Sequence, residues 1–183
     1  MRGKPDDATR SVVPGRSGRV PGAPLHGAST VVRVATPDDV DILVQWHADP
    51  DIAKYWDGET FTREEMLLRL TRSDVDAYVV EADGAPIGYL QAWFEEDRPT
   101  VGGLDMFLTP TARDRGLGPD ASGALARWLV SVGGVSRLTV DPYLSNERAI
   151  RAWTKAGFER VEEREADDEH TQAWLLMLFA PSD

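Results

Sequence analysis

The sequence predicts an α/β domain in which helices flank a mixed central β-sheet. Residues 77–94 have the pattern of two strands joined at Asp83 and Gly84, a pair typical of a tight hairpin turn. Apolar residues between Ala121 and Val132 recur at helical spacing, which indicates an amphipathic helix. Because strands and helices alternate after residue 100, we expect a layered α/β architecture.

The other elements are expected from local signals. Residues 31–35 alternate as a strand, and Thr36 followed by Pro37 starts a helix expected to reach Ala48. Thr62 and Glu65 have the spacing of a capping box, which predicts a second helix. Further along the chain we expect strands at 102–108 and 137–141, a helix at 146–157 and a hydrophobic last strand at 171–179.

Composition is that of one globular domain with a basic leader. The chain has 183 residues, of which 42% are hydrophobic, enough to bury a core. Residues 1–30 hold five Lys or Arg among many Pro and Gly, so we expect a flexible leader at 1–30 and the domain at 31–183. With no apolar stretch long enough to span a bilayer and no secretory signal, a cytoplasmic location is the expectation.

Charge and residue usage exclude several functional classes. The absence of Cys rules out disulfides and thiolate metal sites, and three scattered His residues lack metal-ligand spacing, so no metal is expected. The net charge of −11 argues against nucleic acid or an anionic membrane as the main partner and favours a small cationic ligand. The alternative is that the acidity only serves solubility.

Two local features suggest chemistry. Asp105 interrupts the apolar run GGLDMFL, where a carboxylate needs either a partner or a catalytic role. Arg113, Gly116 and Gly118 form R-x-x-G-x-G between a strand and a helix, and such a loop can bring free backbone amides to phosphate oxygens. Taken alone, the loop equally fits a plain strand-to-helix turn, and it matches neither a P-loop nor G-x-G-x-x-G.

The segment DPYLSNERAIRAWTKAGF at 141–158 follows this loop at a characteristic distance. Together they make residues 31–179 resemble the GNAT superfamily of N-acetyltransferases. The stretches QWHADPDIAKYW, GAPIGYLQAW, GGLDMFL and RGLG look most like the aminoglycoside 6′-N-acetyltransferases. Lysine acyltransferases of siderophore synthesis are similar near residues 46–56 as well.

The resemblance implies acetyl-CoA as co-substrate. Its diphosphate and pantetheine would be bound by a set of residues from the strand, the glycine loop and the next helix: Phe107, Leu108, Arg113, Arg115, Gly116, Leu117, Gly118, Asn146 and Arg148. Helix capping is an alternative and compatible role for Asn146. Pro119 has no amide proton, so one diphosphate donor of the family pattern is missing.

The resemblance also implies roles for acids. Asp105 is expected to be the general base and an anchor for a cationic amine, and Asp141 is expected to bind the acceptor. The alternatives are an ion pair with Arg for Asp105 and a turn-forming Asp-Pro for Asp141. We expect the acceptor cleft to be lined by Tyr55, Trp56, Trp93 and, at its rim, Glu59, against the alternatives of core packing and solvated surface.

One departure from the family concerns the proton for the leaving group. Trp153 stands where the family often has a Tyr, and an indole cannot act as that acid. Tyr143 is a candidate substitute, although we favour a plain surface-loop aromatic at that position.

The expected function is acetylation of an aminoglycoside antibiotic at a 6′ or 2′ amine, kasugamycin-like drugs included, with resistance as the outcome. One alternative is acyl transfer to a lysine side chain or a polyamine. A second is a non-catalytic module that binds CoA or a cationic ligand. Both a monomer and a homodimer are compatible with the sequence.

Overall fold

The computed structural model describes residues 19–56 and 58–180. Its strands are β1 Leu25–His26, β2 Val31–Val34, β3 Val75–Ala82, β4 Ala85–Phe94, β5 Val101–Leu108, β6 Arg137–Val140, β7 Phe158–Arg164 and β8 Trp174–Phe179. Its helices are η1 Pro37–Asp39, α1 Val40–His47, α2 Pro50–Ala53, α3 Arg63–Arg69, η2 Pro110–Ala112, α4 Leu117–Ser131 and α5 Glu147–Ala156. Within these described ranges no helix is both long and apolar enough to cross a membrane.

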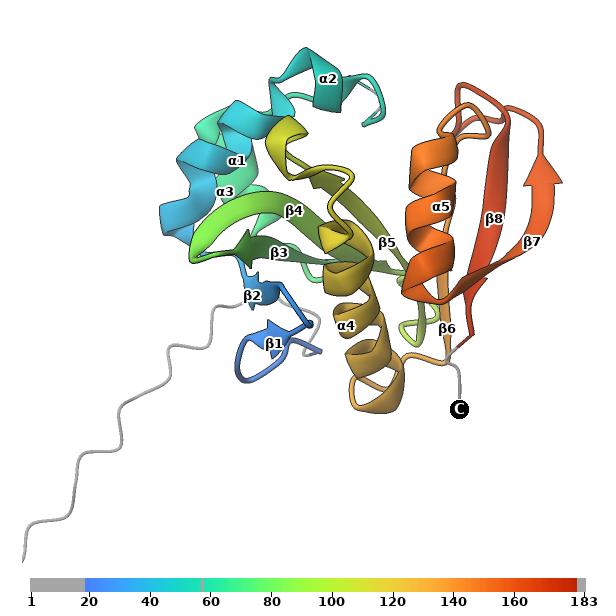
Figure 1. Ribbon diagram of the computed structural model, residues 1–183, viewed down its shortest axis with the longest axis horizontal. Helices are drawn as coiled ribbons and strands as arrows, with labels where there is room; N and C mark the ends of the chain where they lie inside the picture. The colour runs from blue at the N-terminus through green and yellow to red at the C-terminus, as the bar shows by residue number, and fades with distance from the viewer. Residues whose placement is uncertain (1–18, 57, 181–183) are drawn as a thin grey trace, which may run out of the picture.

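All strands belong to one sheet with the order β1-β2-β3-β4-β5-β6-β8-β7 (Figure 1). Neighbouring strands are antiparallel except for β5 and β6, which are parallel. The predicted α/β class with a mixed sheet is therefore confirmed.

Several local signals are confirmed by the structure. Asp83 and Gly84 join β3 to β4 with φ values of 52° and 75°, the left-handed conformation that a type I′ turn requires. The capping box forms at α3, where the Thr62 amide donates to Glu65 at 2.7 Å. Gly157 ends α5 with a φ of 105°.

Other expectations need correction. The helix expected from Pro37 to Ala48 begins instead with the short 3₁₀ turn η1, because Asp39 accepts from the Thr36 amide and pairs with Arg33. The short helix α2 was not expected. Nor was β7, whose sequence FERVEER is charged almost throughout; β7 is an exposed edge strand, where charge prevents pairing with other chains.

The fold also begins earlier than residue 31. Leu25–His26 pairs with β2, and the loop that follows is held by Asp120 in the first turn of α4. Its carboxylate accepts hydrogen bonds from the Ala28 amide at 2.7 Å, the Ser29 amide at 2.8 Å and the Thr30 hydroxyl at 2.8 Å. Residues 25–30 are thus part of the domain, and residues 1–18 of the expected leader lie outside the described residues.

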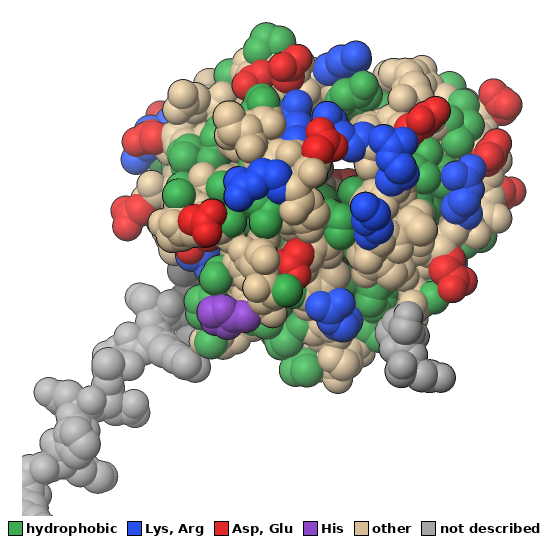
Figure 2. Space-filling view, viewed as in Figure 1, with side chains coloured by type: hydrophobic (Ala, Val, Ile, Leu, Met, Phe, Trp, Pro, Cys, Tyr) green, Lys and Arg blue, Asp and Glu red, His purple; other side chains and the backbone are tan. Residues whose placement is uncertain are grey.

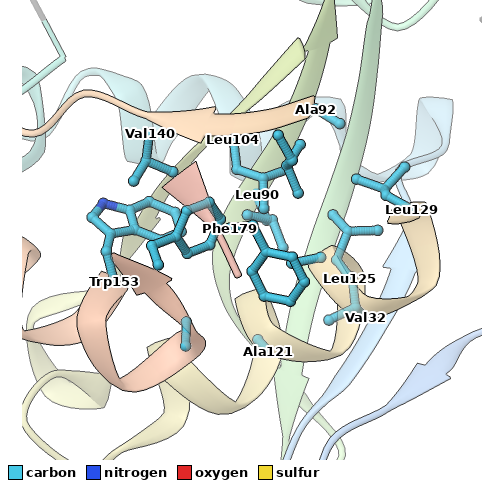
Figure 3. Packing of buried hydrophobic residues seen from close by; sticks show 14 of the residues in the cluster. Val32, Leu90, Ala92, Leu104, Ala121, Leu125, Leu129, Val140, Trp153 and Phe179 are labelled. Carbon is cyan, nitrogen blue, oxygen red and sulfur yellow. The ribbon is translucent and has the colours of Figure 1, made fainter. Parts of the chain in front are cut away.

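Apolar side chains pack on both faces of the sheet. On one face, Leu90 and Leu104 belong to the same cluster as Leu125 of α4, and α5 contributes to this layer as well (Figure 3). On the other face, Tyr89 packs in a cluster with Leu43 of α1 and with α3. Helices therefore cover both faces, and the central strands are buried between them.

The sheet opens between its two parallel strands. β5 pairs with β6 only where residues 101–103 meet residues 137–139. Beyond this point β5 runs on to Leu108 without β6, while β6 ends at Val140 and pairs with β8. Within the described residues, 104–107 of β5 therefore have no strand partner on that side, the Leu108 carbonyl accepts from Arg113 Nε at 3.0 Å, and the space between β5 and α5 becomes available for a ligand.

The contacts of Asp120 allow a test of whether residues 25–30 belong to the folded domain. Burial alone would raise the pKa of Asp120, but the hydrogen bonds from residues 28–30 lower it on balance. Its stabilising contribution is therefore present above the usual carboxyl pKa of about 4 and is lost as the pH falls. Asp120→Asn should lower the free energy of unfolding by about 1–3 kcal/mol at pH 7 in urea titrations. The exposed Asp38→Asn is the matched control, and equal effects of the two changes would contradict the role of Asp120.

Candidate active site

A cavity lies where the sheet opens. Its walls come from four parts of the chain: α2 and the turn after it, the second half of β5, the glycine loop with the start of α4, and α5. The cavity volume is about 260 Å³, just below the usual range of about 300–1,000 Å³ for ligand pockets. Of the expected cofactor residues, those that line it are Phe107, Leu108, Arg113, Gly116, Gly118, Asn146 and Arg148.

The glycine loop is built for close approach of a ligand to backbone. Gly116 has a φ of 77° and is the N-cap of α4, so the first amides of the helix point out of its end without intrahelical partners. A Cβ on Gly118 would lie 3.0 Å from Cε of Met106, the flexible end of a side chain that could move by a few tenths of an ångström to admit it. Pro119 also lines the cavity, and Leu117 instead is buried in the core. Amides at a helix N-terminus are a suitable site for a phosphate.

Basic side chains surround the same cavity, and Figure 2 shows Lys and Arg gathered around a hollow in this face. Four of them line it: Arg113, Arg148, Arg151 and Lys155. Burial and the charge of Arg148 lower the pKa of Arg113, as expected for cations held close together. Arg115 is different, because its guanidinium lies 3.7 Å from Asp83 and does not line the cavity. Two acids, Asp51 and Asp114, line the cavity as well, so the four cations leave a net positive charge that favours an anionic ligand such as a diphosphate.

The start of α5 forms the opposite wall. Asn146 caps the helix, with its Oδ1 accepting from the Ala149 amide at 3.1 Å, and it lines the cavity too. The predicted capping role is thus confirmed. Trp153 is buried, packs edge-to-face on Phe158 at 5.3 Å and also reaches the cavity. At this position the chain offers an apolar wall rather than an acid.

Asp105 lies on β5 two residues beyond the last pairing with β6. Gln91 on β4 donates to its Oδ2 at 2.7 Å, and Arg69 of α3 donates to the Oε1 of Gln91 at 2.8 Å. Tyr89 donates to the same oxygen at 3.0 Å. Among the described residues no Arg pairs directly with Asp105, so the expected alternative of an ion pair is not observed. Instead, a neutral amide orients the carboxylate and leaves its second oxygen available.

The surroundings make Asp105 a weaker acid than usual. Burial raises its pKa to about 7, and the charge of Asp141 acts in the same direction, with a smaller addition from Glu59. A carboxylate that titrates near neutral pH is suited to take a proton from an ammonium group. The charges of Asp141 and Glu59 act on Asp105, and none of these three acids lines the cavity described above.

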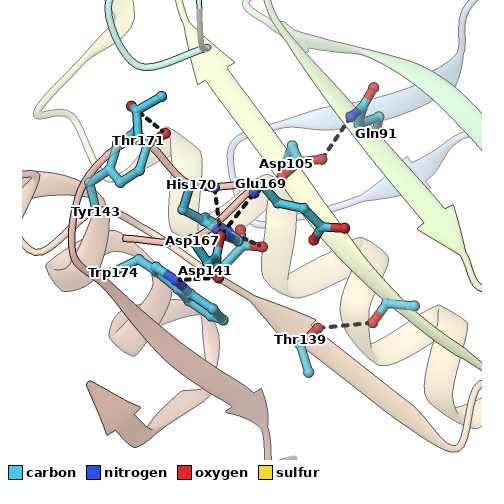
Figure 4. A network of polar contacts seen from close by, with 11 residues as sticks. Gln91, Asp105, Thr139, Asp141, Tyr143, Asp167, Glu169, His170, Thr171 and Trp174 are labelled. Carbon is cyan, nitrogen blue, oxygen red and sulfur yellow. Dashed lines mark hydrogen bonds and ion pairs between the residues drawn. The ribbon is translucent and has the colours of Figure 1, made fainter. Parts of the chain in front are cut away.

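Asp141 directly follows the end of β6, next to the loop between β7 and β8 (Figure 4). Its Oδ2 lies 3.3 Å from Nε2 of His170, and its side chain is 33% exposed. Burial raises the pKa of Asp141, and the contact with His170 reduces this rise. Asp141 therefore has a side-chain partner beyond the turn-forming role that was the alternative.

The expected aromatic residues occupy different parts of the site. Trp56 and Tyr55 line the cavity, and Trp56 packs edge-to-face on Phe107 with ring centroids 5.3 Å apart. Trp93 does not line this cavity. It lies over Gly103, two residues before Asp105 on β5, and a Cβ on Gly103 would approach the indole to 2.4 Å. The aromatic groups thus flank the carboxylate from both ends of β5.

Tyr143 departs from the surface position that we favoured. It is buried, and its hydroxyl lies 3.3 Å from the Thr171 hydroxyl. Sequence reasoning missed the roles of Gln91, Arg69 and His170. A polar residue inside the buried strand YLQAW could have singled out Gln91, whereas no local pattern connects Arg69 or His170 to the site. Within residues 19–56 and 58–180, no group of three or more side chains is arranged to hold a metal ion.

Comparison with known proteins agrees with this geometry. Residues 35–166 match the acetyltransferase (GNAT) domain family. The aminoglycoside N(6′)-acetyltransferase type 1 of Klebsiella pneumoniae is 33% identical over 150 residues, which cover 72% of this chain and 75% of that protein. A kanamycin resistance protein of Rhizobium radiobacter is 42% identical over 69 residues, which cover 37% of this chain and 64% of that protein.

Solved structures of an aminoglycoside acetyltransferase are also similar to this chain. The structure of AAC(6′)-Ib with paromomycin and acetyl-CoA has a TM-score of 0.71 at 28% identity and covers 82% of this chain and 93% of that one. The complex of AAC(6′)-Ib with coenzyme A and kanamycin has a TM-score of 0.69 at the same identity, covering 82% and 94%. The chain belongs to the acetyltransferase (GNAT) domain family.

Proposed function

We propose that this protein transfers the acetyl group of acetyl-CoA to the 6′-amine of an aminoglycoside, which would confer resistance to that antibiotic. The observation that carries the proposal is a carboxylate of raised pKa, Asp105, at the opening of the sheet beside a cavity with basic walls. The relatives named as aminoglycoside 6′-acetyltransferases support the choice of acceptor and of amine.

Binding of acetyl-CoA would use the basic side of the site. The diphosphate would be held by the free amides at the start of α4 and by the cations that line the cavity. Pro119 removes one amide donor, and Arg148, with Arg151 and Lys155 beyond it, supplies charge along α5. When bound, acetyl-CoA supplies an acetyl group activated as a thioester.

The acidic side would hold and activate the acceptor. Asp105 and Asp141 attract ammonium groups, and Asp105 takes the proton from the reacting ammonium, directly or through one water. The neutral amine nitrogen then forms a bond to the acetyl carbon while the bond from that carbon to sulfur breaks. Asp105 passes this first proton to solvent and then accepts the second proton, which the nitrogen loses as the amide forms.

The leaving thiolate does not need a strong acid in this scheme. A thiol of this kind has a pKa of about 8.5, so the thiolate can depart and take its proton from water. This accounts for Trp153 at a position where no side-chain acid is available.

Neutralising one ammonium group removes a charge that such a drug uses to bind RNA, which gives resistance a physical basis. The 2′-amine and kasugamycin-like drugs remain alternative targets. Rival activities are acetylation of a polyamine or a lysine side chain, and binding of CoA without turnover.

An assay of the purified full chain distinguishes these possibilities. Thiol release from acetyl-CoA is followed with kanamycin, ribostamycin, kasugamycin, spermidine and Nα-acetyllysine, and the acetylated amine is located by NMR. Turnover with kanamycin at the 6′-amine is the expected result. Turnover only with spermidine or the lysine derivative would overturn the proposed acceptor, and no turnover with any amine would support the binding module.

Asp105→Asn should remove the base and leave the shape of the site intact. We expect kcat for kanamycin to fall by about 100-fold or more, because general base catalysis contributes about 10²–10⁴-fold. Kanamycin binding, measured by calorimetry, should weaken by less than about tenfold. A variant that retains most of its turnover would contradict the role of Asp105.

The same variant should be more stable than the wild type at pH 8. A carboxyl group whose pKa is raised by folding contributes fully to stability below its unfolded pKa of about 4, and this contribution is lost as the pH rises through the folded pKa of about 7. Asn does not ionise, so Asp105→Asn does not undergo this loss. Its free energy of unfolding at pH 8 should exceed that of the wild type by about 1 kcal/mol or more, since one pKa unit corresponds to about 1.4 kcal/mol. Thermal unfolding between pH 5 and 8 tests this, and a difference that does not grow with pH would refute it.

Arg148 and Arg115 provide a matched pair for the diphosphate site. Arg148 lines the cavity, whereas Arg115 pairs with Asp83 outside it. Arg148→Ala should weaken coenzyme A binding by about tenfold, the value of one charge-assisted contact at a partly exposed site. Arg115→Ala should change it by less than about twofold. Calorimetric titration with coenzyme A measures both, and a larger effect of Arg115→Ala would contradict the assignment.

A further inference from the structure

His170 belongs to the loop that joins β7 to β8. Its ring lies between the carboxylate of Asp167, in the same loop, and that of Asp141, which follows β6 (Figure 4). Its Nδ1 is 2.9 Å from Asp167 Oδ1, and its Nε2 is 3.3 Å from Asp141 Oδ2. A neutral imidazole carries one N–H only, so it can donate to one of these acids and turns a lone pair toward the other. With both acids ionised, both contacts are favourable only when both ring nitrogens are protonated.

The ring is held firmly on the side away from Asp141. It stacks on the Trp174 indole with centroids 4.1 Å apart and planes inclined by 16°. Asp167 also accepts from the backbone amides of Glu169 at 2.9 Å and of His170 at 2.7 Å, and from Trp174 Nε1 at 3.2 Å. His170 is only 13% exposed, in contrast to Asp141 at 33%. The imidazole is thus fixed by its own loop, and Asp141 retains an accessible surface.

The charges around this pair favour the protonated ring. Burial lowers the pKa of His170, but the hydrogen bond with Asp167 and the charge of Asp141 raise it on balance. The charged and titratable groups that face the pair from the surrounding elements are Asp167 and Glu169 of the loop, Asp105 of β5, Tyr143 before α5, and Arg164 of β7 over the Trp174 ring. The carboxylates outnumber the single cation among them.

We propose that His170 is the resident counter-ion of Asp141, and that an ammonium group of the acceptor replaces it in that role. The inference rests on the proposed function in one respect, namely that the acceptor is a polycation. The longer contact, 3.3 Å to Asp141 against 2.9 Å to Asp167, is the one that is easier to exchange. An ammonium beside Asp141 shields its charge, so the proton on Nε2 is held less tightly and leaves to solvent.

This makes His170 a positioning residue for the acceptor. Without a ligand it keeps Asp141 ionised and oriented, which limits the cost of placing two acids close together. With a cationic amine present, His170 becomes neutral and still donates to Asp167 through Nδ1. Neutral amines and acceptors with one positive charge gain less from the exchange, so the arrangement favours polycations.

Ring titration by NMR tests the proposal directly. The full chain, labelled with ¹⁵N-histidine, contains three His residues, and His170→Gln identifies the relevant signals. Without acceptor, both nitrogens of His170 should be protonated at pH 6, and Asp141→Asn should lower its pKa by about one unit or more. Saturating kanamycin should lower the pKa by a similar amount in the wild type and by little in Asp141→Asn.

Steady-state kinetics supply a second readout. The quantity to measure is the ratio of the KM for kanamycin in the wild type to the KM in His170→Gln. This ratio should fall by up to about tenfold as the pH rises from 6 to 8, because His170 loses the positive charge that competes with the drug for Asp141. Gln retains a donor but carries no charge, so a purely structural role would leave this ratio constant. His26→Gln, at an exposed position on β1, is the control and should match the wild type.

The possible failures are distinguishable. If kanamycin is acetylated but leaves the His170 titration unchanged, the counter-ion role is refuted and the proposed function stands. If kanamycin is not acetylated, the proposed function fails. In that case the acceptor-free comparison of wild type with Asp141→Asn decides whether His170 serves Asp141, and an unchanged titration refutes it.

Discussion

The separation of β5 from β6 is the constraint on which the site depends. Two parallel strands that stayed paired would bury the second half of β5 in the sheet and leave no room for a ligand. Because pairing stops at Gly103 and Thr139, the second half of β5 borders the cavity, and Asp105 on β5 and Asp141 just after β6 lie next to the opening between these two strands. The packed layers on both faces of the sheet hold this opening in place.

The site has a mainly basic side and an acidic side, which meet at this opening. One side combines the start of α4 with the cations of the cavity wall and suits a phosphate-bearing ligand. The other side gathers Asp105, Asp141 and Glu59 and suits a cationic acceptor. A thioester donor and an amine acceptor could thus approach the same end of β5 from opposite directions, which is the geometry that direct acyl transfer needs. The same acidic surroundings raise the pKa of Asp105 toward the working pH.

Sequence patterns predicted what depends on local chemistry. The Asp83-Gly84 turn, the Thr62 capping box and the amphipathic helix α4 follow from neighbouring residues, and the glycine loop and Asp105 stood out against their surroundings. The strand β7 was not predicted because almost all of its residues are charged, so its sequence does not alternate between apolar and polar residues. Arg115 was misplaced because its ion pair with Asp83 spans distant parts of the chain. Contacts of Gln91 and His170 with the acids likewise depend on strand register and loop closure, which no local pattern encodes.

The most direct test of the proposed site is a crystal structure of the full chain with coenzyme A and kanamycin. We expect the diphosphate on the amides of residues 116–118 and an amine of the drug within about 3 Å of the Asp105 carboxylate or linked to it through one water. A diphosphate bound elsewhere, or a drug whose amines all lie away from Asp105 while coenzyme A occupies the cavity, would contradict it.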